Sequence, residues 1–159
     1  MLTDEERREI EAEFPHYPYK HNLVIDALQV VQRHRGWISD ESIRDIAAFL
    51  DMSPDEVDGV ATFYNLIFRK PVGRHIIRMC NSITCWLTGY QRVLDRVNVS
   101  LGISFAQTTG DGQFTLLPIQ CLGACDRAPA MMVDEELYLD LTPEKVDEIL
   151  QRYRAEGSG

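Results

Sequence analysis

Four cysteines are the residues of this sequence best suited to chemistry, and all of them lie in its second half. Cys80 and Cys85 have four residues between them, Cys121 and Cys125 have three, and 35 residues separate the two pairs. The chain opens on Met1 and a run of polar residues, without the basic and apolar regions of a secretion signal. In a reducing compartment, cysteines serve as metal ligands or redox groups more often than as disulfides. We therefore expect a metal centre or a redox site.

Three chemistries are open to two cysteine pairs with these spacings. A structural zinc ion takes four thiolates in a tetrahedron, from pairs with two to four residues between them. A [2Fe-2S] cluster takes two thiolates on each iron, and plant-type ferredoxins have a four-residue gap in their first ligand loop. A thioredoxin-like dithiol has two residues between its cysteines, a spacing that this sequence lacks. The spacing favours the cluster, with zinc and disulfide chemistry as the alternatives.

Histidines do not accompany the cysteines. A Rieske-type centre needs two histidine ligands, but His16, His21 and His34 lie in the first half of the chain and His75 lies at the start of a predicted strand. The sequence also lacks the glycine-rich patterns G-x-G-x-x-G and G-x-x-x-x-G-K that cradle nucleotide phosphates. We expect no nucleotide site on this chain.

Residues around the cysteines could tune such a centre. Gly123 permits a positive φ, so the loop between Cys121 and Cys125 can fold tightly and aim backbone N–H groups at sulfur. Arg78 and Arg127 flank the two cysteine segments and either offset the charge of the thiolates or are ordinary surface charges. Apolar side chains that either shield the centre from water or belong to an ordinary core are Ile83, Trp86, Leu122, Met131 and Met132.

The first half of the chain has the apolar period of helices. Thr3 with Glu6, and Ser53 with Glu56, fit capping boxes that begin the first and the last of these helices. Gly36 suits a left-handed helix end. Apolar residues at helical spacing predict a small bundle of four helices, at about residues 4–14, 24–35, 43–50 and 54–64.

After Pro71 the pattern changes to alternating strands and helices. Strands are expected at 75–79, 114–119, 130–133 and 137–139, and helices at 90–101 and 143–153. This order is that of a thioredoxin-like α/β domain, and Gly157-Ser158-Gly159 is expected to be a frayed tail. The predicted fold is a helical bundle over residues 1–72 followed by a thioredoxin-like α/β domain over residues 73–159. Both cysteine pairs follow strands, and loops after neighbouring strands of a sheet can meet at one edge.

Composition excludes several classes of partner. Sixteen Lys and Arg against 25 Asp and Glu give a net charge of −9, the wrong sign for binding a nucleic-acid backbone. No apolar run reaches the roughly 18 residues that cross a bilayer, so we expect no direct membrane insertion. The absence of a signal predicts a cytoplasmic protein.

Two further features have open interpretations. Phe63, Tyr64 and Phe68, near the end of the helical half, are either core residues or a hydrophobic docking patch. Pro129, just before a predicted strand, lies where thioredoxin-like folds often have a cis-proline. By this analogy, the Ala128-Pro129 bond is a candidate cis peptide bond.

Three segments of the sequence resemble one known family. His75–Cys85 and Cys121–Met132 are similar to the two ligand segments of the E subunits of bacterial NADH-quinone oxidoreductase, respiratory complex I, and Gly59–Tyr64 is similar to that family's signature in the preceding helical region. The similarity runs from about Glu13 to Tyr153 and includes every cysteine.

The resemblance implies one [2Fe-2S] cluster, with Cys80, Cys85, Cys121 and Cys125 at the family's ligand positions. It also implies an electron-transfer subunit of an oxidoreductase, docked on a flavin-containing subunit that binds NADH and FMN, with the large iron-sulfur subunit as a further neighbour. The location implied is the cytoplasmic side of the inner membrane, as a peripheral part of the complex. The same module serves NAD-linked hydrogenases and formate dehydrogenases, and a structural zinc scaffold is the alternative of another class.

Overall fold

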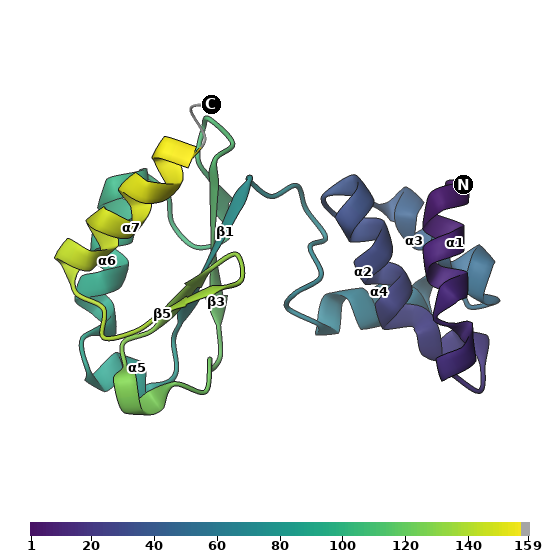
Figure 1. Ribbon diagram of the computed structural model, residues 1–159, viewed down its shortest axis with the longest axis horizontal. Coiled ribbons are helices and arrows are strands. Elements are labelled where there is room, and N and C mark those ends of the chain that lie inside the picture. Colours follow the sequence, from purple (N-terminus) through teal and green to yellow (C-terminus); the bar gives the residue numbers. More distant parts are fainter. Residues whose placement is uncertain (157–159) are drawn as a thin grey trace. The chain divides into compact units, whose positions relative to one another are not determined.

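The computed structural model describes residues 1–156, which form two compact units. The first unit covers Met1–Pro71 and the second begins at Val72. The expected frayed tail, residues 157–159, lies outside the described residues. Figure 1 shows a first unit built of helices and a second built of helices and a sheet.

Start signals in the sequence determine where the helices of the first unit begin. Thr3 caps the first of them, its side chain accepting a hydrogen bond from the N–H of Glu6, while the Glu6 side chain accepts one from the N–H of Thr3. Ser53 and Glu56 repeat this box, and Gly36 ends the second helix with φ +82°. In residues 1–71 the elements are α1 (Asp4–Ala12), α2 (Val24–Arg35), α3 (Asp40–Leu50) and α4 (Pro54–Phe63), with short 3₁₀ helices at Phe14–His16 and Lys20–Leu23.

A buried ion-pair network ties α1 to α2 and α3. Glu6 is 1% exposed, and its carboxylate accepts hydrogen bonds from Arg35 Nε at 2.7 Å and Nη2 at 2.8 Å. Arg35 also donates to Asp45 on α3 at 3.1 Å. The Arg35 guanidinium holds the pKa of the Glu6 carboxyl at about 2 against the usual 4.5, although burial acts in the opposite direction. These three residues, far apart in sequence, join three helices of the bundle.

The second unit is a mixed sheet covered by helices. Figure 1 shows α6 and α7 side by side on one face of this sheet. The sheet order is β2-β3-β1-β4-β5, in which β1 and β3 run parallel and the other neighbours antiparallel. Its elements are β1 (His75–Cys80), α5 (Ile83–Leu87), α6 (Tyr90–Leu101), β2 (Gln107–Thr108), β3 (Phe114–Ile119), a 3₁₀ turn (Cys125–Arg127), β4 (Met131–Val133), β5 (Glu136–Tyr138) and α7 (Pro143–Glu156).

The predicted fold class is confirmed, with local corrections. The strand expected at 137–139 lies one residue earlier, because Asp134 adopts a left-handed φ of +54° and turns the hairpin at once after β4. The first helix ends at Ala12 instead of reaching Phe14, which lies in the 3₁₀ helix that follows. The short elements that were not expected are α5, the two-residue strand β2 and the 3₁₀ helices at Phe14–His16, Lys20–Leu23 and Cys125–Arg127.

Candidate metal centre

Parallel pairing of β1 with β3 brings the two cysteine segments to one edge of the sheet. The register places Cys80, the last residue of β1, opposite Ile119, the last residue of β3. Directly beyond this pair, Asn81 donates its N–H to the Ile119 carbonyl at 3.0 Å. Cys121 is therefore only two residues beyond the partner of Cys80, although the two cysteines are distant in sequence.

The first cysteine pair is buried and held by regular structure. Cys80 and Cys85 are each 2% exposed, the first in β1 and the second in α5. The expectation that both lie in a loop is wrong, because the chain forms a short helix almost at once after the strand. Cys80 is fixed further by donating its N–H to the Ala130 carbonyl at 3.2 Å.

The second cysteine pair is exposed and lies in an irregular segment. Cys121 and Cys125 both face solvent, and Cys125 begins a 3₁₀ turn. Gly123 has φ +75°, and its N–H donates to Cys121 Sγ at 3.3 Å. This is the tight loop that the glycine predicted, and an N–H aimed at sulfur stabilises a thiolate.

The buried Cys85 thiol lies in an environment that disfavours its charged form. Burial raises the pKa of the Cys85 thiol to about 11, a hydrogen bond with Cys80 raises it as well, and the charge of Cys125 adds to the effect. A backbone hydrogen bond with Ala130 acts in the opposite direction. A thiolate there needs a compensating positive charge, which a bound metal supplies.

The donor set suits a cluster with two irons. Thiolate sulfur is the ligand of both zinc and iron-sulfur centres, and each iron of a [2Fe-2S] cluster takes two protein thiolates. Within residues 1–156, no three His, Cys, Asp or Glu side chains are gathered around the position of a single metal ion. The cysteines form two pairs, one buried and one exposed, and together they offer the four thiolates that either centre requires.

The apolar side chains considered either as a shield for the centre or as ordinary core divide into two groups. Met131 is fully buried, and Leu122 and Met132 are half-buried. Ile83 and Trp86 are instead 66% and 61% exposed, so neither belongs to the core. Cys85 faces the core from α5. Ile83, two residues before it, and Trp86, one residue after it, point in other directions, because residues one or two positions apart do not share a helix face.

The two arginines interpreted either as offsetting thiolate charge or as surface charges have partners elsewhere in the second unit. Arg78 is half-buried and donates to the Asp134 carbonyl at 2.7 Å, and burial lowers the pKa of its guanidinium. Arg127 pairs with Asp140, with Nη2 and Oδ2 2.6 Å apart. The Ala128-Pro129 bond is cis, as the analogy with thioredoxin-like folds suggested.

Exposed aromatic residues end the helical unit. Phe63 is 81% exposed and Tyr64 42%, and their rings meet edge to face with centroids 5.3 Å apart. Phe68 is buried, so the interpretation as core applies to Phe68 and that of an exposed patch to the other two. Solvent-exposed aromatic pairs are typical of surfaces that contact other proteins.

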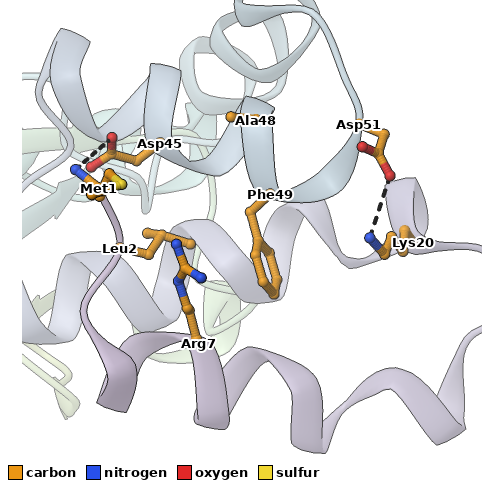
Figure 2. A pocket seen from close by; sticks show the side chains of 8 residues that line it. All are labelled: Met1, Leu2, Arg7, Lys20, Asp45, Ala48, Phe49 and Asp51. Carbon is orange, nitrogen blue, oxygen red and sulfur yellow. Dashed lines mark hydrogen bonds and ion pairs between the residues drawn. The ribbon is translucent and has the colours of Figure 1, made fainter.

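The helical unit contains a cavity of about 290 Å³, at a distance in sequence from the cysteines. Figure 2 shows the Phe49 ring in this cavity between two ion pairs, Met1 with Asp45 and Lys20 with Asp51. These two pairs contain four of the five charged groups that line the cavity, and the fifth is Arg7. The thiols of the second unit are the better candidates for chemistry.

Comparison with known proteins gives the family. The family model of the thioredoxin-like [2Fe-2S] ferredoxins matches residues 10–154. The E subunit of NADH-quinone oxidoreductase from Pseudomonas aeruginosa is 46% identical over 96% of this chain and 92% of its own length. The protein of the same name from Salmonella typhimurium is 49% identical over the same shares.

A solved structure supports the fold. The crystal structure of an NAD⁺-reducing [NiFe]-hydrogenase in the air-oxidized state contains a chain that matches with a TM-score of 0.72. The match covers 84% of this chain and 23% of the hydrogenase chain, and at 20% identity it shows a shared fold alone. No helix within residues 1–156 has the length and apolar character needed to cross a membrane. By the family match and by its close relatives, the chain belongs to the thioredoxin-like [2Fe-2S] ferredoxin family, among the NADH-quinone oxidoreductase E subunits.

Proposed function

We propose that the chain is the electron-transfer subunit of an NADH-quinone oxidoreductase and that Cys80, Cys85, Cys121 and Cys125 hold one [2Fe-2S] cluster. The observation that carries this proposal is the register of β1 with β3, which places Cys80 opposite Ile119 and so beside the second cysteine segment. The relatives, nearly half identical over almost the full chain, support the parent complex.

The protein supplies the environment of the cluster. A bound [2Fe-2S] cluster accepts and gives one electron at a time. Cys80 and Cys85 hold their side of it in buried, regular structure, while the exposed loop supplies Cys121 and Cys125. Burial of one pair and the Gly123 N–H on the other act on the reduction potential through solvent access and charge stabilisation.

The electron partner proposed is the flavin-containing subunit of the same complex, which would bind FMN and NADH. This chain has no nucleotide-binding pattern, so the two-electron chemistry of NADH must be done elsewhere. Helix α5 carries Cys85 on its buried side and three exposed apolar side chains, Ile83, Trp86 and Leu87, the last 70% exposed. An apolar surface next to a redox centre suits close contact with an electron partner.

The helical unit is proposed to contribute to the same assembly. Its exposed Phe63 and Tyr64 form a second docking surface, and the large iron-sulfur subunit is a further proposed neighbour. In this assembly the chain would lie on the cytoplasmic side of the inner membrane, held there by the other subunits.

The test is the metal content of the anaerobically purified full chain and of its variants. We expect two irons and two sulfides per chain, visible absorption, and an S = 1/2 electron paramagnetic resonance signal after reduction with dithionite. Cys121→Ser should remove or perturb this signal while the circular dichroism of the helices is retained. Ser82→Ala is the matched control, because Ser82 precedes α5 without capping it by a side-chain hydrogen bond.

Each result has a clear meaning. A colourless protein with one zinc ion would refute the electron carrier and favour an interaction scaffold. Iron and sulfide that persist unchanged in Cys121→Ser would refute the assigned ligand set. Loss of all helical circular dichroism in that variant would show that the site primarily holds the fold.

A further inference from the structure

The exposed loop with Cys121 and Cys125 has few hydrogen bonds to distant parts of the chain. At its beginning, Ile119 accepts from Asn81, and at its end Ala130 accepts from Cys80. Between these points the described hydrogen bonds within the loop are short-range ones, from Gly123 N–H to Cys121 Sγ at 3.3 Å and from Arg127 N–H to the Ala124 carbonyl at 3.2 Å. Leu122, Ala124 and Ala128 of this loop pack against the core of the unit, whereas the two thiols themselves are exposed. The positions of the thiols therefore depend also on the hydrogen bonds that join the loop to other segments.

The loop is tied to the segment that joins β5 to α7. Asp140 donates its N–H to the Arg127 carbonyl at 2.8 Å, and Leu141 donates to the Pro129 carbonyl at 3.1 Å. The side chains of Arg127 and Asp140 reinforce this contact, because Arg127 Nε and Nη2 both donate to Asp140 Oδ2, at 2.8 and 2.6 Å. Backbone and side chain of the same residue pair thus hold the loop two residues beyond Cys125.

Asp140 is itself fixed to the rigid part of the unit. Its backbone is left-handed, with φ +48°, and its carbonyl accepts a hydrogen bond from Lys145 Nζ of α7 at 2.8 Å. The next residue, Leu141, is 5% exposed and belongs to the core of this unit. Arg127 therefore joins the loop that carries Cys121 and Cys125 to an anchored segment, the one between β5 and α7.

We propose that Asp140 is a positioning residue for the metal centre, which acts through Arg127 to hold Cys121 and Cys125 in place for cluster binding. This inference rests on the proposed function, because the role assigned to Asp140 requires that the four cysteines hold a cluster. The described hydrogen bonds of Asp140 are with Arg127 and Lys145 and not with a cysteine, so Asp140 acts through another residue. The ion pair of Arg127 with Asp140 would determine how firmly Cys121 and Cys125 retain the cluster.

Cluster loss and spectroscopy test this role in the anaerobically purified full chain. The variants are Asp140→Asn, Arg127→Gln and the two together, and the rate of cluster loss to an iron chelator is followed by visible absorption. Each single variant should lose its cluster about two- to five-fold faster, the range expected for breaking one exposed ion pair. The double variant should be no faster than either single one, because one contact is broken in all three.

The signal of the reduced cluster separates positioning from plain charge effects. Positioning predicts that both single variants shift the g-values in the same direction, since both release the same loop. Charge alone predicts opposite shifts, because one variant removes a positive and the other a negative charge. The matched control is the ion pair of Arg96 with Asp147 between α6 and α7, with contacts of 2.7 and 2.6 Å, whose variants Arg96→Gln and Asp147→Asn should leave loss rate and g-values unchanged.

Several results would overturn the proposal. These are single variants that match the wild-type protein, single effects that multiply in the double variant, and opposite g-value shifts. Amide hydrogen exchange at Arg127 and Asp140 gives a readout that needs no cluster, and it should accelerate in both single variants. A wild-type protein without iron would refute the proposed function, whereas insensitive variants of a cluster-containing protein would refute only the positioning role.

Discussion

Replacing Glu6 with glutamine should remove one large contribution to the acid sensitivity of the helical unit. Glu6 is 1% exposed and accepts two hydrogen bonds from Arg35, which also reaches Asp45. A neutral amide keeps the shape of the side chain but cannot form the ion pair. Because α1, α2 and α3 meet in this network, its loss should act on the unfolding of the whole unit.

The magnitude follows from the pKa of Glu6. Its carboxyl has a pKa of about 2 in the folded chain against the usual 4.5, a difference equivalent to about 3 kcal/mol of folding free energy. A lowered folded pKa stabilises the protein above pH 4.5, and this contribution is lost as the pH falls from 4.5 toward 2. At about pH 3, the loss amounts to about 2 kcal/mol.

Urea unfolding followed by tryptophan fluorescence measures this loss in the helical unit. The chain has two tryptophans, so Trp86→Phe leaves Trp37 of the helical unit as the sole reporter. In this background, the free energy of unfolding is measured at neutral pH and at about pH 3. We expect Glu6→Gln to be less stable at neutral pH by about 3 kcal/mol and the gap to shrink to about 1 kcal/mol at about pH 3.

A neighbouring acid provides the control. Glu5 lies on the same turn of α1 but is exposed, so Glu5→Gln should follow the pH dependence of the parent protein. Other carboxylates titrate in this range too, and the difference between parent and variant cancels them. A constant gap between parent and Glu6→Gln at both pH values would refute the reasoning, since the ion pair would then contribute nothing that protonation removes.

Two further predictions concern the metal centre and its surroundings. Gly123→Ala places a side chain on a residue with φ +75°, which costs about 1 to 2 kcal/mol in the ligand loop. Iron and sulfide analysis should therefore show lower cluster occupancy in this variant. Full occupancy with an unchanged rate of cluster loss would contradict this. Trp86→Glu places a charge on the exposed face of α5 and should weaken binding to the flavin-containing subunit at least about ten-fold in a titration. The cluster signal of this variant should stay intact. The control is Val99→Glu, at an exposed position of α6, which should bind as the wild type does.

Short-range signals explain why the fold could be predicted from the sequence. The capping boxes at Thr3 and Ser53 are local, so the starts of α1 and α4 follow from residues three apart. The strands are apolar runs with turn residues at their ends, and β3 was expected with the bounds it has. Helix α5 gives no such signal, because it has five residues and Ser82 makes no capping hydrogen bond.

The candidate site could be predicted only in part. Spacing and family resemblance identified the four cysteines as candidate ligands, but the burial of Cys80 and Cys85 and the exposure of Cys121 and Cys125 depend on tertiary packing. The contact of Arg127 with Asp140 was not expected either. The two residues are 13 positions apart on different elements, and no local rule pairs an exposed arginine with one of many carboxylates.

The parallel pairing of β1 and β3 also has a consequence for the order of folding. Cys80 and Ile119 lie 39 positions apart, so their pairing is a non-local contact that forms late and closes a long loop. Helix pairs such as α3 and α4 are neighbours in sequence and have low contact order. On the ribosome, the helical unit can therefore be complete while the thiols of the nascent chain are still apart. Cluster insertion then has to wait until synthesis has passed β4. Ala130, the residue before β4, accepts the hydrogen bond from the Cys80 N–H that holds the two segments together.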